Sequence, residues 1–336
     1  MSLRVLDIGP ACTVQDMGRE GFLDQGLSRS GAADLLALHE GATLLGQDPG
    51  LAALEMAGMG GSFEALQDTR IALTGAPMLA SIDAVPVVWN TSHMLGKGQR
   101  LTIGAVRRGS YGYLHLGGGV GVAEMLHSRS THLAAHLGTV VQQGDILPTL
   151  PDGGDRIGMM LPVDDRFSGG TLRVLKSFQT GLFSPDTLAR FEETIFRRGP
   201  RANRMGMQLE SDGEGFSASG QLNILSEVIT PGDIQMTGTG NPFILLPECQ
   251  TTGGYPRIAT VLPCDIPRAA QAQPGAQIRF RFVSLPDALT LHEAFQRDLV
   301  KLPGRPEPQV RDPNDMPDLL SYQLVGGVIS ATEPGD

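Results

Sequence analysis

Ile71-Ala72-Leu73-Thr74-Gly75 is similar to a run that comes much later in the chain, Ile234-Gln235-Met236-Thr237-Gly238. Each run is short and mostly apolar and ends at a glycine, a pattern typical of a buried strand that is followed by a turn. Two such strands at a wide separation suggest that one β unit occurs twice.

A second pair of runs supports the repeat. The run Tyr113-Leu114-His115-Leu116 begins 31 residues before Gly144 (144 − 113). In the same way, the run Ile244-Leu245-Leu246 begins 31 residues before Gly275 (275 − 244). The first copy carries 32 more residues between its two runs (113 − 71 = 42 against 244 − 234 = 10), so we predict two related β-barrel units with an insertion in the first.

Composition agrees with many short strands and tight turns. The chain of 336 residues has 44 glycines and 23 prolines but only 5% aromatic residues. We expect strands at residues 3–8, 70–74, 85–89, 100–103, 111–116, 144–147, 172–176, 233–237, 243–246 and 277–283. Helices are expected at 34–45, at 184–196 behind the cap Ser184, and from Ser284 onward. The predicted fold class is mainly β, a β-rich α+β protein.

The predicted organisation is a first β-barrel domain at residues 1–165, a second at 166–302 and a proline-rich tail at 303–336. A net charge of −10 without a run of Lys or Arg argues against nucleic-acid or anionic-membrane partners. The N-terminus lacks an apolar signal core and no stretch reaches transmembrane length, so we expect a cytoplasmic protein. Three widely spaced cysteines fit neither a disulfide framework nor a metal knuckle.

Thr251-Thr252-Gly253-Gly254-Tyr255-Pro256 follows an apolar strand and is the clearest candidate for a ligand-binding turn. Two hydroxyls lie beside two glycines, whose freedom to adopt left-handed or other unusual backbone angles lets successive N–H groups converge on one oxygen. The alternative is a glycine turn that only closes a hairpin.

The chain as a whole resembles the biotin-dependent carboxyltransferase-like family, which includes the C subunit of 5-oxoprolinase, allophanate hydrolase subunit 2 and the carboxyltransferase part of urea carboxylase. The matching motifs include Thr13-Val14-Gln15-Asp16 with Gly18-Arg19, Ser30-Gly31-Ala32 with Asp34, Leu54-Glu55, Ser128-Arg129-Ser130-Thr131, Arg204-Met205-Gly206 and Gln250-Thr251-Thr252-Gly253-Gly254-Tyr255-Pro256. The chain departs from the usual pattern at Asn203 and at Glu248-Cys249, and Cys249 is given no catalytic task.

This resemblance implies a pair of tandem cyclophilin-like β-barrels and chemistry on a small amide. The leading interpretation is the C subunit of an ATP-dependent 5-oxoprolinase, which opens the 5-oxoproline lactam to glutamate with a smaller B-type partner protein and a lactam-processing A-type protein. One alternative is a carboxyltransferase that moves a carboxyl group from biotin on another protein to urea or a related amide. Another is a non-catalytic regulatory partner of a kinase-inhibitor protein.

The candidate site residues are chosen from the motifs that carry this resemblance, because an oxyanion must be held while an amide reacts. Arg204, Thr252 and Glu55 are the predicted catalytic residues. The predicted substrate-binding residues are Gln15, Asp16, Arg19, Ser30, Asp34, Gln235, Thr251, Gly253, Gly254 and Tyr255. ATP is expected to be shared with a partner protein, because no phosphate loop is present. No metal is expected, since His127, His132 and His136 lack a recognisable set of further ligands.

Overall fold

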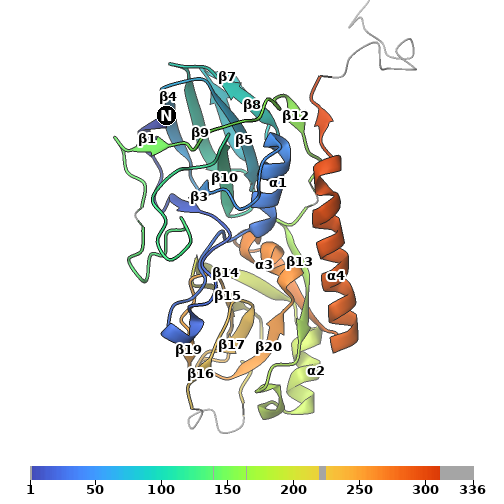
Figure 1. Cartoon of the computed structure of the whole chain (residues 1–336). Coiled ribbons are helices and arrows are strands. Elements are labelled where there is room, and N and C mark those ends of the chain that lie inside the picture. Colours follow the sequence, from blue (N-terminus) through green and yellow to red (C-terminus); the bar gives the residue numbers. More distant parts are fainter. Residues whose placement is uncertain (1, 139, 164, 219–224, 311–336) are drawn as a thin grey trace, which may run out of the picture.

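The computed structural model describes residues 2–138, 140–163, 165–218 and 225–310 (Figure 1). Strands dominate this part of the chain and helices are few, as the composition predicts. The α-helices are α1 (Leu35–Leu45), α2 (Pro185–Glu193), α3 (Ile266–Gln271) and α4 (Leu285–Lys301). In the described residues, no helix is both long and apolar enough to cross a membrane.

The first half of the chain forms two sheets packed around a shared core. The first has the order β11 (Ile146–Pro148), β1 (Ser2–Ile8), β4 (Gly61–Ala65), β9 (Arg100–Val106), β6 (Met78–Ile82) and β7 (Val85–Pro86). The second has the order β2 (Thr13–Gln15), β3 (Ala53–Ala57), β10 (Tyr111–Leu116), β5 (Thr69–Gly75) and β8 (Ser92–Leu95). Leu3, Phe63, Leu73 and Leu114 are fully buried in the core that both sheets share, because alternate side chains of a strand face the same side.

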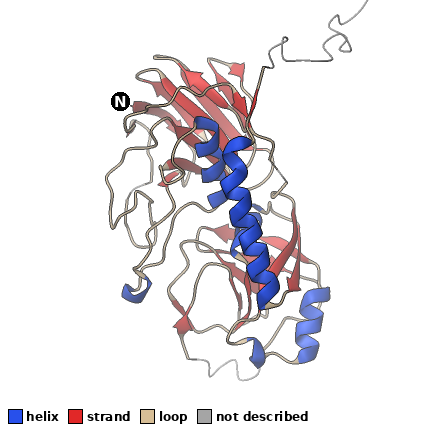
Figure 2. Ribbon diagram, turned by 45° about the vertical axis from the view of Figure 1, so that its right-hand side comes forward, coloured by secondary structure: helices blue, strands red, loops and turns tan. Residues whose placement is uncertain are grey.

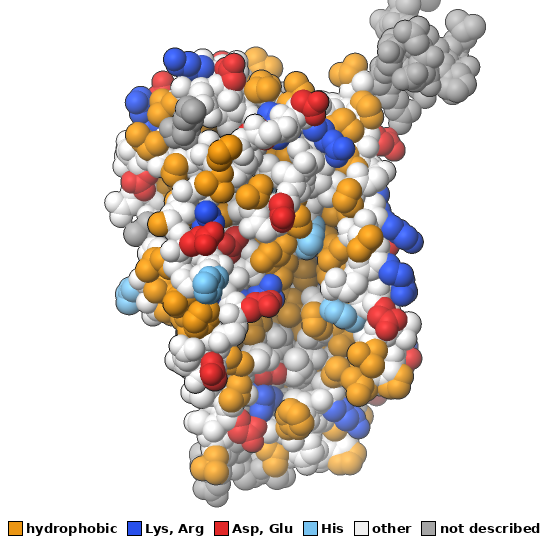
Figure 3. Space-filling view, in the orientation of Figure 1, with side chains coloured by type: hydrophobic (Ala, Val, Ile, Leu, Met, Phe, Trp, Pro, Cys, Tyr) orange, Lys and Arg blue, Asp and Glu red, His pale blue; other side chains and the backbone are white. Residues whose placement is uncertain are grey.

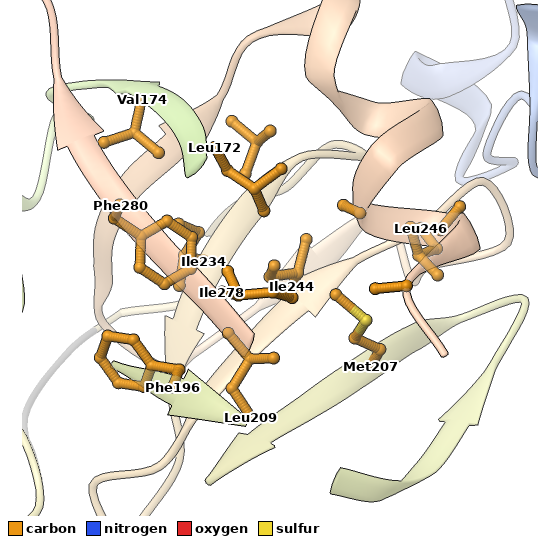
Figure 4. Close-up of a cluster of buried hydrophobic side chains, with 14 of the residues drawn as sticks. Leu172, Val174, Phe196, Met207, Leu209, Ile234, Ile244, Leu246, Ile278 and Phe280 are labelled. Atoms are coloured by element: carbon orange, nitrogen blue, oxygen red, sulfur yellow. The ribbon is translucent and has the colours of Figure 1, made fainter. Parts of the chain in front are cut away.

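The second half forms a closed barrel. Its strands follow the order β13 (Gly169–Leu175), β20 (Arg257–Val261), β17 (Asp233–Met236), β18 (Pro242–Leu245), β15 (Gly206–Glu210), β14 (Phe196–Asn203) and β21 (Gln277–Phe282). Figure 4 shows Phe196, Ile234, Ile244 and Phe280 inside it, and all four are at most 2% exposed. Closure leaves no free strand edge on this sheet.

The pairing of strands agrees with the repeat seen in the sequence. β5 pairs antiparallel with β10, where Thr74 faces Tyr113, and β17 pairs antiparallel with β18, where Ile234 faces Ile244. In each half, therefore, the two repeated runs form an antiparallel pair of strands.

Helices and core residues join the two halves. Figures 1 and 2 show α4 running along one side of both halves, with α1 and α3 near the junction. One buried cluster includes Ala33, Leu38 and Tyr113 of the first half together with Ile244 and Phe280 of the barrel. The side chain of Asp34 caps α1 by accepting from Ala37 N at 3.2 Å.

Some element ends differ from the predictions. The strand expected at 85–89 ends at Pro86. The helix expected to reach Phe196 ends at Glu193, because Phe196 begins β14 and packs on Phe191 with ring centroids 5.4 Å apart. Within the predicted tail, β22 (Glu307–Pro308) pairs with β12 (Met159–Met160). Residues 311–336 of that tail lie outside the described residues, and the domain boundary at 165/166 stays a prediction.

Candidate functional site

A buried guanidinium lies where the two halves meet. Arg204 is in the turn between β14 and β15, is 5% exposed, and donates from Nε to Glu248 Oε1 at 2.5 Å. It also donates to Glu55 Oε1, and its remaining nitrogen donates to Ser30 Oγ at 3.3 Å and to Gly31 O at 2.6 Å. Burial opposes the charge on Arg204, but the carboxylates of Glu55 and Glu248 outweigh it, so the pKa of Arg204 is raised.

Glu55 is fully engaged as well. Its second oxygen accepts from Ala33 N at 2.8 Å and from the Tyr113 hydroxyl at 2.7 Å. Burial, with Glu55 alongside, holds the pKa of Tyr113 well above its ordinary value, so the phenol keeps the proton that it donates. Arg204 and Glu55 thus fasten the loop of residues 30–34 between the two halves. Neither presents a free charge to a ligand.

Asp34 forms a second anchor. It is fully buried, and its Oδ2 accepts from Arg166 Nε at 2.7 Å and from Gln271 Nε2 at 2.8 Å. Arg166 also donates to both oxygens of Glu40, at 2.8 and 2.7 Å. The predicted binding residue Asp34 therefore caps α1 and ties that helix to residues from the second half.

Gln15, Asp16 and Arg19 hold the Ser128–Thr131 motif rather than an open cavity. Asp16 accepts from Ser128 Oγ and from Arg129 N, both at 2.6 Å, and Gln15 Nε2 donates to Thr131 O at 3.1 Å. Arg19 is 2% exposed and donates to Ser130 O. Two buried atoms, Gln15 Oε1 and Arg19 Nη1, have no hydrogen-bond partner among the described residues.

The Thr251–Pro256 turn contains a short strand. β19 (Thr252–Gly253) pairs with β16 (Glu227–Val228), and Tyr255 is 51% exposed. Neither Gly253 nor Gly254 has a positive φ, so this turn does not use left-handed backbone angles, and the convergence of its N–H groups on a ligand stays a prediction. The Gln235 amide lies close to Gly253: a Cβ there would lie 2.5 Å from Gln235 Nε2, a buried donor without a partner among the described residues.

Thr251 and Thr252 line a hollow of about 400 Å³ that we call the small pocket. Ser28, His132, Glu248 and Cys249 also line it, and the imidazole Nε2 of His132 lies 2.8 Å from Ser28 Oγ. Burial, reinforced by Asp233, raises the pKa of Cys249 to about 12, so it stays a thiol, in line with giving it no catalytic task. No cluster of His, Cys, Asp or Glu able to hold a metal ion occurs within the described ranges.

A larger hollow of about 930 Å³, the central groove, lies between α1, α3 and α4. Figure 3 shows hydrophobic surface gathered in this hollow, with histidine side chains nearby. Its lining includes Ser30, Ala32, Ala33, Leu36, Thr43, Pro263, Ile266, Phe295 and Leu299. The ionisable side chains among its lining residues are Arg29, His39, Arg156 and His292, and that lining includes no Asp or Glu.

The central groove and the small pocket lie on either side of the Arg204 cluster. Ser30 lines the groove, Glu248 lines the small pocket, and Arg204 bonds to both. Among the predicted site residues, the structure thus brings Ser30 to the groove and Thr251 and Thr252 to the pocket. Sequence reasoning missed the groove, because α4 and α1 are far apart in the chain; the apolar positions Phe295 and Leu299, four residues apart on a helix, were the available signal.

Residues 25–282 match the carboxyltransferase domain family, subdomains A and B. The chain is 33% identical to the C subunit of 5-oxoprolinase from Haemophilus influenzae over 85% of this chain and 93% of that protein, and 32% identical to that of Escherichia coli over 90% and 98%. Its fold also resembles the solved urea carboxylase of Kluyveromyces lactis, with a TM-score of 0.80 and 22% identity, over 93% of this chain and 31% of the urea carboxylase.

Proposed function

Because this chain belongs to the carboxyltransferase domain family, we propose that it is the C subunit of an ATP-dependent 5-oxoprolinase and that the central groove binds the lactam. Two relatives, 33% and 32% identical to this chain, are named as the C subunit of 5-oxoprolinase. In this proposal a smaller B-type protein and a lactam-processing A-type protein complete the enzyme, and ATP is shared with a partner.

One observation carries the choice of substrate. The ionisable groups lining the groove are arginines and histidines, and its described lining has no carboxylate. 5-Oxoproline carries a carboxylate, whereas urea is neutral, so guanidinium groups favour the lactam. A hydrogen bond to a charged group contributes about 1.5–3 kcal/mol, and largely apolar walls suit the lactam ring.

Arg29 and Arg156 are the proposed carboxylate ligands. Arg29 Nε donates to Met17 O at 2.8 Å, and its Nη2 forms an ion pair with Glu20 Oε1 at 3.4 Å. Arg156 Nη1 donates to Thr43 O at 3.0 Å. These contacts orient both guanidinium groups and leave other N–H donors for a ligand. Ser30 lies on the same wall, where its hydroxyl accepts from Arg204 Nη2 at 3.3 Å and donates to Thr131 O at 2.8 Å. In this proposal Arg204 and Glu55 position the loop of residues 30–34. Thr252 lies outside the groove, in the lining of the small pocket.

The runner-up function is biotin-dependent carboxyl transfer to urea. It is supported by Saccharomyces cerevisiae urea amidolyase, 25% identical over 88% of this chain and 17% of that protein. In that case biotin would arrive on another protein.

Reconstitution separates these functions. The chain is mixed with its B-type and A-type partner proteins, and glutamate formed from 5-oxoproline with ATP is compared with urea consumed in the presence of a carrier protein whose biotin has been carboxylated. ATP-dependent glutamate that disappears when this chain is omitted supports the proposal. Urea consumption alone would establish the carboxyltransferase. Inactivity with both substrates, together with tight partner binding, would support a regulatory protein.

A further inference from the structure

The central groove is open along α4, close to the point where the described chain ends. Val300 and Pro303 belong to its lining. After β22 the chain is fixed by a bond from Gln309 N to Gly158 O at 2.7 Å, and the sequence continues for 26 residues beyond Val310 (336 − 310). Val310 is seven residues from Pro303, so it lies within about 25 Å of the groove edge.

The segment after Val310 is long enough to reach back to the central groove. Residues 311–318, fully extended, span about 26 Å. Residues from 319 onward can therefore reach the groove without moving any described element. A short tether also gives its segment a local concentration in the millimolar range.

The sequence of that segment complements the groove. Asp312, Asp315 and Asp318 come first, and residues 319–332 then contain no charged side chain. The apolar members of this second stretch are Leu319, Leu320, Tyr322, Leu324, Val325, Val328 and Ile329. Acidic groups followed by apolar groups match a groove with apolar walls whose ionisable lining consists of arginines and histidines.

We propose that residues 311–336 fold back and occupy the central groove. The acidic stretch 312–318 pairs with Arg29 and Arg156, and the apolar stretch 319–329 packs on Leu36, Phe295 and Leu299. The docking stands on the groove alone. Its consequence, competition with the lactam and hence autoinhibition of the enzyme, rests on the proposed function.

A peptide experiment tests the docking. A fluorescent peptide of residues 311–336 is titrated by polarisation with the full chain and with a chain ending at Val310. Saturable binding to the truncated chain and at least tenfold weaker binding to the full chain are expected, because the tethered segment competes. Equal binding to both chains, or no binding to the truncated chain at millimolar concentration, would overturn the proposal.

Two variants of the truncated chain locate the contact. Arg156→Glu in the groove should weaken the peptide at least tenfold, whereas Arg4→Glu, an exposed arginine in the first sheet, should change it less than twofold. Equal effects would place the peptide elsewhere. Light scattering gives the oligomeric state: a dimer of the full chain that Arg156→Glu dissociates would put a second copy in the groove instead. These readouts do not use glutamate formation, so they stand or fall separately from the enzyme assay.

Discussion

Removing the Arg204 guanidinium should destabilise the protein severely. In Arg204→Met the carboxylates of Glu55 and Glu248, 1% and 2% exposed, lose the cation that both contact. Breaking a buried pair in this way costs about 3–5 kcal/mol, since a buried charge is left without compensation. At roughly 2–4 °C per kcal/mol, the melting temperature should fall by about 6–20 °C in scanning calorimetry at pH 7.

A matched triple variant separates charge from packing. Adding Glu55→Gln and Glu248→Gln to Arg204→Met removes the orphaned charges but keeps side-chain oxygens that accept from Ala33 N and Leu133 N. The triple variant should regain at least half of the lost melting temperature. A drop below about 2 °C in Arg204→Met, or a triple variant less stable than the single one, would refute the buried ion cluster.

Three further predictions concern other buried groups. Burial lowers the pKa of His115 to about 3, below the unfolded value near 6.5, so this neutral histidine stabilises the fold above pH 6.5. About 2–3 kcal/mol of that stability should disappear as the pH falls to 4.5. In urea titrations, the free energy of unfolding of His115→Gln should lack this pH dependence. The same pH dependence in His115→Gln and in the wild type would contradict the lowered pKa of His115. Burial is the main cause that raises the pKa of Cys12 and of Cys249 to about 12. Both thiols should therefore resist iodoacetamide at pH 8 until the protein unfolds. Alkylation of either cysteine in the native protein, detected by mass spectrometry, would contradict this prediction. Gly253→Ala should cost about 1–3 kcal/mol by overpacking against Gln235, and Gln235→Ala should relieve most of that loss in the double variant, whereas simple addition of the two losses would rule out the contact.

The sequence predicted local structure well where the pattern was local. The caps Ser184 and Ser284 start α2 and α4 as expected, because a side-chain oxygen that accepts a first-turn N–H is a short-range signal. The repeated runs at 71–75 and 234–238 became β5 and β17. Motif resemblance identified the family, which the comparison with known proteins confirmed.

The site was harder to predict, because its geometry depends on contacts between distant segments. From the sequence, Arg204 was predicted to be a catalytic cation. In the structure it lies between Glu55 and Glu248, which are 149 and 44 residues away in the chain. Gly253 was predicted to let the turn adopt left-handed or other unusual backbone angles, whereas in the structure its φ is not positive and it lies close to the Gln235 amide. The central groove combines α1 with α4, and no local pattern indicates that pairing.

The most direct test of the proposed function is the kinetic response of the reconstituted enzyme to loss of the groove cations. Arg29→Gln combined with Arg156→Gln removes two positive charges from the groove, and Arg4→Gln removes an exposed charge from the first sheet. If the groove binds the 5-oxoproline carboxylate, the double variant should raise KM for 5-oxoproline at least tenfold while Arg4→Gln leaves it within twofold. An unchanged KM in the double variant, with glutamate still formed at the wild-type rate, would show that the lactam binds elsewhere.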